Sequence, residues 1–339
     1  MTLVTFWFAV LVVLWTGFLV LEGFDFGVGM LHGVVGGGEA GRRAAIRAVG
    51  PLWDGNEVWL IVAAAGMFAA FPGWYATMFS GFYLPLLLLL VALIARGVSF
   101  EFRGRRDGAR WRRTWDAAMT GGSLLAPLLI GVALGNLLHG VPIGADQEYT
   151  GDLADLLNPY SLFTGVTFVL LCALHGATFL ALKTTGGVRL RAVRTARRVA
   201  PLTVAAVLGF AVWTAVLADK GLPAWLPEVV AVLAAAAAAW LVGRDRDGAA
   251  FTATTVTIAM VVLSIFAGLY PRVMVSTAGS ATDLTVTNTA SSPYTLRVMT
   301  VVAAVLLPVV LAYQGWTYYV FRRRVGDLDV PAASDAGRG

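Results

Sequence analysis

Apolar residues dominate the chain in long runs that short polar segments separate. Nine runs are long enough to cross the apolar core of a bilayer, which takes about 20 helical residues. They lie near residues 4–31, 52–71, 76–98, 116–138, 161–183, 199–218, 226–243, 249–270 and 297–321. The pattern predicts an all-α, polytopic integral membrane protein with about nine transmembrane helices. We expect a single transmembrane helical domain over residues 1–325, followed by a disordered cytoplasmic tail over 326–339.

The composition fits a surface that faces lipid. Hydrophobic residues make up 58% of the chain and charged residues 13%, whereas a soluble protein uses roughly a quarter charged residues. The N-terminus is apolar from Leu3 without a preceding basic segment, so we interpret it as a retained helix and not a signal peptide. The one cysteine, Cys172, excludes a disulfide framework and a cysteine-based metal cluster. We expect no metal site.

Basic residues alternate between the two sides of the predicted bundle. All but three of the 25 Lys and Arg residues lie in or beside alternate loops and in the C-terminal segment. The exceptions are Lys220, Arg272 and Arg297. Because cytoplasmic loops carry the Lys and Arg excess, the N-terminus is predicted outside and the C-terminus in the cytoplasm. The net charge is +5, and the basic residues lie in short blocks that suit anionic lipid headgroups. No nucleic-acid partner is therefore expected.

Four carboxylates interrupt the first two predicted spans. Glu22 and Asp25 are three residues apart in the first helix, and Asp54 and Glu57 have the same spacing near the start of the second. Residues three apart share one face of a helix. At 1.5 Å per residue, Asp25 lies roughly 30 Å from the outer end of its helix, close to the cytoplasmic start of the second helix. The topology therefore predicts that the two pairs lie at a similar depth.

The third predicted span adds charge at that depth. It returns with Arg96, and Glu101 lies just beyond. An electrostatic interpretation is that the helix macrodipole favours Asp54 and that Arg96 snorkels to the headgroups. We favour a functional interpretation, in which the intramembrane carboxylates form a proton-entry path and Arg96 offsets part of their charge.

Two further features allow cofactor hypotheses. His175 lies in the middle of the fifth span and could ligate a haem, but a bis-His haem needs a second inward histidine, so a structural role is favoured. Aromatic residues gather at the outer end of helices two and three, where an interfacial belt is the usual interpretation. The alternative is a quinone or lipid groove near Trp53, Trp74 and Tyr75.

A set of motifs in these segments resembles subunit II of the cytochrome bd-type quinol oxidases. The matching segments are Glu22–Leu31 (EGFDFGVGML), Gly50–Leu60 (GPLWDGNEVWL), Phe68–Tyr75 (FAAFPGWY), Phe79–Tyr83 (FSGFY), Arg96–Arg103 (RGVSFEFR), Gly131–Pro142 (GVALGNLLHGVP) and Leu157–Pro159 (LNP). They keep the family order from the first helix to the fifth. Asp25, Asp54 and Arg96 match the family's charged positions, and Glu22 and Glu57 follow by neighbourhood only.

The resemblance implies a fold of two four-helix bundles plus a peripheral helix. It also implies that the chain is a multi-pass protein of a bacterial cell membrane. It implies a partner, subunit I, that carries two b-type haems and haem d, oxidises quinol and reduces dioxygen to water. Subunit II of that family has no haem of its own, can hold a quinone and contributes to a cytoplasmic proton path. Membrane lipids and small accessory subunits are further candidate partners.

The sequence thus predicts a haem-free integral subunit of a terminal quinol oxidase that supplies a scaffold and a proton inlet, with no catalytic residue of its own. One alternative is a proton-coupled membrane transporter that uses the same carboxylates, although paired broken helices at mid-membrane are not evident. Another is a free-standing membrane cytochrome, which needs a second ligand to pair with His175.

Overall fold

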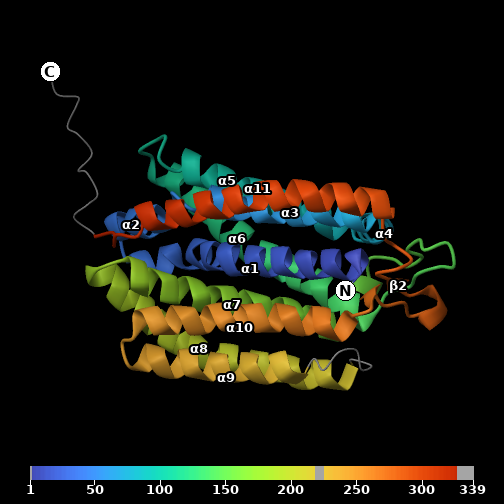
Figure 1. Cartoon of the computed structure of the whole chain (residues 1–339). Helices are drawn as coiled ribbons and strands as arrows, with labels where there is room; N and C mark the ends of the chain where they lie inside the picture. The colour runs from blue at the N-terminus through green and yellow to red at the C-terminus, as the bar shows by residue number, and fades with distance from the viewer. Residues whose placement is uncertain (1, 218–224, 327–339) are drawn as a thin grey trace.

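The computed structural model describes residues 2–217 and 225–326, and in these segments the chain is an elongated bundle of nearly parallel and antiparallel helices (Figure 1). The helices are α1 (Leu3–Gly36), α2 (Glu39–Val49), α3 (Trp53–Ala70), α4 (Pro72–Gly81), α5 (Tyr83–Phe102), α6 (Ala109–His139), α7 (Pro159–Lys183), α8 (Gly186–Leu217), α9 (Trp225–Gly243), α10 (Asp247–Leu269) and α11 (Pro293–Val320). Two short 3-10 helices, Asp155–Leu157 and Ser280–Thr282, and two short strands, β1 (Arg272–Met274) and β2 (Leu284–Thr285), complete them. The predicted tail beyond residue 326 lies outside the described residues.

Helix α1 organises the packing. It contacts α2, α3, α6, α7 and α10, and Figure 1 shows it between a layer with α3 and α11 and a layer with α7 and α10. Helices α7 to α10 pack against one another as a second group. Helix α11 lies at the edge, against α1 and α3, and of its residues only Leu296 is buried.

Eight of the described helices are long and apolar enough to cross a membrane: α1 and α5 to α11. The remaining predicted span, 52–71, corresponds to α3, which has 18 residues and carries Asp54, Asn56 and Glu57 in its first two turns. Those polar residues lower its mean hydropathy, although at 1.5 Å per residue its length is about 27 Å. The chain is a polytopic membrane protein, and the count of nine spans stays a prediction.

Several helix boundaries differ from the sequence prediction. The span expected over 76–98 is two helices, α4 and α5, which meet at Phe82. Pro85 explains the break, because it has no N–H to donate to the carbonyl of Gly81. The segment 32–51, expected as a loop, contains the amphipathic helix α2. The basic segment 184–198, also expected as a loop, is the start of α8.

The two ends of the bundle have different character. One end we call the arginine-rich end. It holds α2, the C-terminal ends of α1 and α5, and the N-terminal ends of α3, α6 and α8. At the opposite end, the loops that follow α6 and α10 pack together. Val141 pairs with Ser276 in an isolated bridge, and β1 pairs with β2 in an antiparallel sheet.

Glycines allow the central helices to approach closely. A Cβ on Gly27 of α1 would lie 1.9 Å from the carbonyl oxygen of Cys172 on α7. A Cβ on Gly176 of α7 would lie 2.4 Å from the carbonyl carbon of Gly27. No side chain fits at this crossing, which is the small-residue packing typical of membrane helices. The close approach brings the polar face of α1 into the centre of the bundle.

Candidate functional site: a buried polar cluster toward the arginine-rich end

The predicted charged residues of three helices meet inside the bundle. Glu22 and Asp25 of α1, Asn56 of α3 and Arg96 of α5 are all 0% exposed. The first turns of α3 lie beside the C-terminal half of α1, and α5 returns to the same depth, as the predicted topology requires. The structure therefore brings Glu22, Asp25 and Arg96 together.

Arg96 is the positive centre of this cluster. Its Nη1 lies 2.5 Å from Oε1 of Glu22 and 3.7 Å from Oε2 of Glu57. Its guanidinium carbon lies 4.8 Å from the ring centroid of Phe26 and 5.4 Å from that of Phe100, within the range of a cation–π contact. Full burial shows that Arg96 does not snorkel to the headgroups, so that part of the electrostatic interpretation is wrong.

Asn56 connects the second carboxylate to the cluster. Its Nδ2 donates a 2.7 Å hydrogen bond to Oδ2 of Asp25. Its Oδ1 accepts two hydrogen bonds from α11, from Gln314 Nε2 at 3.0 Å and from the Tyr318 hydroxyl at 2.9 Å. Asp25 is therefore held on one oxygen by a side chain that other helices orient.

Several buried polar atoms of the cluster have no hydrogen-bond partner within the described protein. They are both carboxylate oxygens of Glu22, Oδ1 of Asp25 and the three guanidinium nitrogens of Arg96, ion pairs apart. Buried polar atoms are costly unless they are paired or hydrated. Three carboxylates also face one guanidinium, which cannot neutralise all of them, so at least one is a candidate to carry a proton. The arrangement suits the transfer of protons through water.

Glu57 and Asp54 lie toward the surface from this cluster. The Glu57 side chain is 21% exposed and Asp54 is exposed. Both line a cavity of about 400 Å³ between α3 and α5, with Val58, Ile94 and Gly97 among its walls. Glu101 is also exposed, and within the described ranges it makes no ion pair with Arg96. The predicted charged residues thus form three groups. Glu22, Asp25 and Arg96 are buried, Asp54 and Glu57 lie at the cavity, and Glu101 lies apart from both groups.

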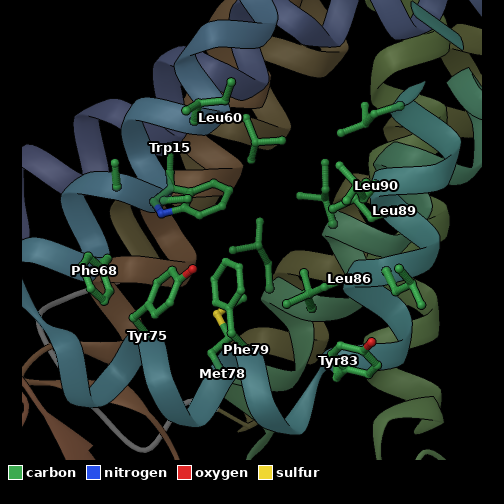
Figure 2. Close-up of a pocket in the computed structure, with 18 residues that line it drawn as sticks. Trp15, Leu60, Phe68, Tyr75, Met78, Phe79, Tyr83, Leu86, Leu89 and Leu90 are labelled. Atoms are coloured by element: carbon green, nitrogen blue, oxygen red, sulfur yellow. The ribbon is translucent and has the colours of Figure 1, made fainter. Parts of the chain in front are cut away.

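A larger apolar groove opens between α3 and α5 nearer the opposite end. It has a volume of about 570 Å³, and Figure 2 shows Trp15, Phe68 and Tyr75 on one side of it and Leu86, Leu89 and Leu90 on the other. Because α3 packs mainly on α1 and α5 mainly on α6, the two helices leave this opening. The buried indole nitrogen of Trp15 has no hydrogen-bond partner among the described residues.

The structure separates the three residues predicted for a quinone or lipid groove. Tyr75 lines the groove. Trp74 is 1% exposed and belongs to the core behind it. Trp53 stacks on Phe100 with ring centroids 4.9 Å apart and belongs to the lining of neither cavity. Of the three residues, only Tyr75 lines the groove, and the sequence did not indicate Trp15 as a wall residue.

An ionic network ties the helices together at the arginine-rich end. Arg103, which follows α5, donates to both carboxylate oxygens of Glu39 at 3.0 Å and from Nε to Asp116 at 2.5 Å. Asp116 also accepts from Arg42 at 3.2 Å and lies 3.0 Å from Nε2 of His32. Burial raises the pKa of Glu39, but hydrogen bonds from Arg103 and Arg43 outweigh it, so that the pKa is lowered. The network is a structural clasp between α1, α2, α5 and α6.

His175 has the geometry of a structural histidine. Its Nδ1 lies 2.7 Å from the Thr254 hydroxyl, and its Nε2 lies 3.2 Å from the carbonyl oxygen of Val20. The ring stacks on Phe251 with centroids 4.6 Å apart. Both ring nitrogens thus have protein partners, which does not fit an iron ligand. Over residues 2–217 and 225–326, no group of three or more His, Cys, Asp or Glu is placed to hold a metal ion.

On α11, sequence reasoning indicates Gln314 as a residue that hydrogen-bonds between helices, as it does to Asn56, but it missed Tyr318. Gln314 and Tyr318 are four residues apart and share one face of an otherwise apolar helix. That spacing is the only signal in the sequence, and it does not say which residue they meet. The Glu39–Arg103–Asp116 network was also missed, because its members were assigned to basic loops or left unassigned.

Comparison with known proteins agrees with these features. Residues 3–321 match the family described as cytochrome bd terminal oxidase subunit II. The chain is 45% identical over 323 residues to cytochrome bd ubiquinol oxidase subunit 2 of Bacillus subtilis, covering 94% of this chain and 96% of that protein. It is 36% identical over 361 residues to cytochrome bd-I ubiquinol oxidase subunit 2 of Escherichia coli K12, covering 96% and 95%.

A solved structure shares the fold. The bd oxidase from Geobacillus thermodenitrificans superimposes with a TM-score of 0.72 at 20% identity, covering 94% of this chain and 99% of that one. The similarity of fold and the sequence matches along almost the whole chain lead to one assignment. The chain belongs to the cytochrome bd terminal oxidase subunit II family.

Proposed function

We propose that this protein is the haem-free subunit II of a quinol:oxygen oxidoreductase in a bacterial cell membrane. The curated relatives are named as subunits of ubiquinol oxidases, and the match over almost the whole of each chain supports the same role here. Quinol oxidation and the reduction of dioxygen to water would take place on a partner, subunit I, that carries two b-type haems and haem d. This chain supplies the scaffold.

We also propose that the buried polar cluster is a proton inlet. The observation that carries this proposal is the set of fully buried carboxylates, Glu22 and Asp25, around Arg96, with Glu57 and Asp54 between them and a cavity that opens toward the surface. Asp54 and Glu57 take up protons at the opening, and Glu22 and Asp25 pass them inward through water held by the unpaired polar atoms. The arginine-rich end would face the cytoplasm, as the distribution of basic residues predicts.

Substituting the carboxylates one at a time tests the proton inlet. In the whole oxidase complex, Asp25→Asn should slow dioxygen consumption at least tenfold, because a positioned proton carrier contributes roughly 10²–10⁴ in rate. Asp54→Asn should have a smaller effect, because Asp54 is exposed and Glu57 lies beside it. Asp107→Asn is the matched control, since that side chain is 98% exposed and apart from the cluster. Unchanged turnover in Asp25→Asn with the haems retained would exclude Asp25 from the path.

The same complex distinguishes the other two candidate functions. A free-standing cytochrome requires a haem on this chain, and both nitrogens of His175 are engaged by protein groups. A transporter would act without a partner. The isolated chain is expected to show no haem absorption and no proton-coupled uptake, whereas the co-purified complex shows the full haem spectrum. A haem spectrum from the isolated chain would contradict the proposal.

We propose further that the apolar groove between α3 and α5 holds the carbon chain of a quinone or a membrane lipid. The supporting observation is the buried Trp15 N–H, a donor without a protein partner at the wall of an apolar groove, where a carbonyl oxygen would satisfy it. Trp15→Phe should reduce the quinone or lipid that mass spectrometry finds in the purified complex, whereas Trp316→Phe, on the exposed face of α11, should not. Equal retention in both variants would remove Trp15 from such a site.

A further inference from the structure

Helix α11 lies at the edge of the bundle, yet two of its side chains reach the buried cluster. Gln314 and Tyr318 both donate to Oδ1 of Asn56, at 3.0 Å and 2.9 Å. Both side chains are half-buried, whereas most of their neighbours on α11 are exposed. The contact is therefore specific, since little else holds this part of the helix against α3.

Asp25 and these two donors agree on which way the Asn56 amide faces. With Oδ1 toward α11, Nδ2 donates to Asp25 at 2.7 Å and to the carbonyl oxygen of Leu21 at 3.4 Å. The flipped amide would place its oxygen against the carboxylate of Asp25. The flip would lose the hydrogen bond to Asp25 and bring two oxygens together, so the observed orientation is favoured.

We propose that Gln314 and Tyr318 are positioning residues for proton transfer, which act through Asn56 to hold the carboxylate of Asp25. The inference rests on the proposed proton inlet and extends it to the peripheral helix. Oδ2 of Asp25 is held by Asn56, while Oδ1 has no hydrogen-bond partner in the described part of the chain. One oxygen is therefore anchored, and the other is free to exchange a proton with water.

The groups that face Asp25 determine how a change at α11 should alter the pH dependence of turnover. They are Glu22 on its own helix, Glu57 on α3, Arg96 on α5 and Tyr318 on α11. Among the described residues, Asn56 alone donates a hydrogen bond to the carboxylate. Loss of a donor to a carboxylate favours its protonated form. Freeing Asn56 should therefore move the alkaline limit of turnover to higher pH.

The test compares three sets of variants in the whole oxidase complex. Gln314→Leu/Tyr318→Phe removes both donors on α11. Asn56→Leu removes the side chain that connects them to Asp25. The triple variant tests whether α11 acts only through Asn56. Tyr319→Phe is the matched control, because Tyr319 is 63% exposed on the same helix. The readouts are dioxygen consumption against pH and the infrared carbonyl band of Asp25, identified by its loss in Asp25→Asn.

The double variant should shift the alkaline limit upward, by no more than Asn56→Leu does, because it loosens the hydrogen bond to Asp25 that Asn56→Leu removes. It should also move the Asp25 band, and adding the changes to Asn56→Leu should have no further effect. A band and pH profile like those of Tyr319→Phe would overturn the proposal, as would additive effects in the triple variant.

The infrared band separates this proposal from the proton inlet itself. Suppose that the band moves in the double variant but that Asp25→Asn, measured separately, turns over normally. That pair of results would support the positioning of Asp25 and refute its place in the proton path. If the double variant does not assemble, Tyr318→Phe alone removes one hydroxyl, and an unmoved band in that variant would overturn the proposal.

Discussion

Replacing Arg96 with methionine tests the energetics of the buried cluster most directly. Arg96 and Glu22 are both fully buried and their charged atoms are 2.5 Å apart. Removing one partner of a buried ion pair costs about 3–5 kcal/mol, because the other charge is left uncompensated. At 1.4 kcal/mol per factor of ten, Arg96→Met should lower the ratio of folded to unfolded protein roughly a hundredfold to several thousandfold.

The effect is measured on the assembled complex, as the thermal midpoint followed by haem absorption. Arg96→Met/Glu22→Gln removes both charges and should recover most of the loss, because no unpaired charge then remains at Glu22. Arg105→Met, at an exposed position that follows α5, is the matched control and should melt like the parent. An Arg96→Met complex that melts with the parent would refute the reasoning, and so would a double variant no more stable than the single one.

Two further predictions concern packing and pH. Gly176→Ala should destabilise the complex by at least about 1–3 kcal/mol, because the added Cβ meets the backbone of Gly27 at 2.4 Å. Gly33→Ala, with no atom within 4 Å of its added Cβ, should be neutral or slightly stabilising, and equal thermal midpoints for the two variants would contradict the packing argument. Because the pKa of Glu39 is lowered from its usual 4.5, its contribution to stability is complete above that pH and is lost as the pH falls further, through the folded-state pKa. The difference in thermal midpoint between the parent and Glu39→Gln should therefore shrink as the pH falls below 4.5, and a difference that grows there would refute the sign.

The sequence predicted most of the helices because apolar length is itself the requirement for crossing a bilayer. It failed where a local feature interrupts or extends an apolar run. Pro85 lies inside a continuous apolar stretch, so hydropathy did not show the break between α4 and α5. The helix α2 and the first turns of α8 are polar, so a search for apolar spans assigned them to loops. Such segments fold as helices because they pack on the bundle.

The parts of the candidate site that depend on spacing within one helix, or on the depth of a helix in the membrane, were predictable from the sequence. The spacing of three residues placed Glu22 with Asp25, and the topology placed Arg96 at the same depth. The link to α11 was not predictable, because Asn56 and its two donors are 258 and 262 residues apart. Periodicity within a helix says which residues share a face, but the rotation of one helix against another follows from packing alone. Trp15 was missed in the groove for the same reason.

The energetics of the buried charges favour the functional interpretation over the structural one. A buried ion pair contributes little or no net stability compared with apolar residues of similar volume, because the cost of desolvation offsets the attraction. Stability alone therefore does not account for Glu22 and Arg96 at 0% exposure, and still less for Asp25, whose single hydrogen bond comes from an amide. An ionic clasp for joining helices is already present in the Glu39–Arg103–Asp116 network, at a partly exposed position where desolvation is milder. What the buried cluster adds, and the clasp lacks, is a set of unpaired oxygens close to an opening between α3 and α5. That combination supports the proposal that protons enter the bundle there.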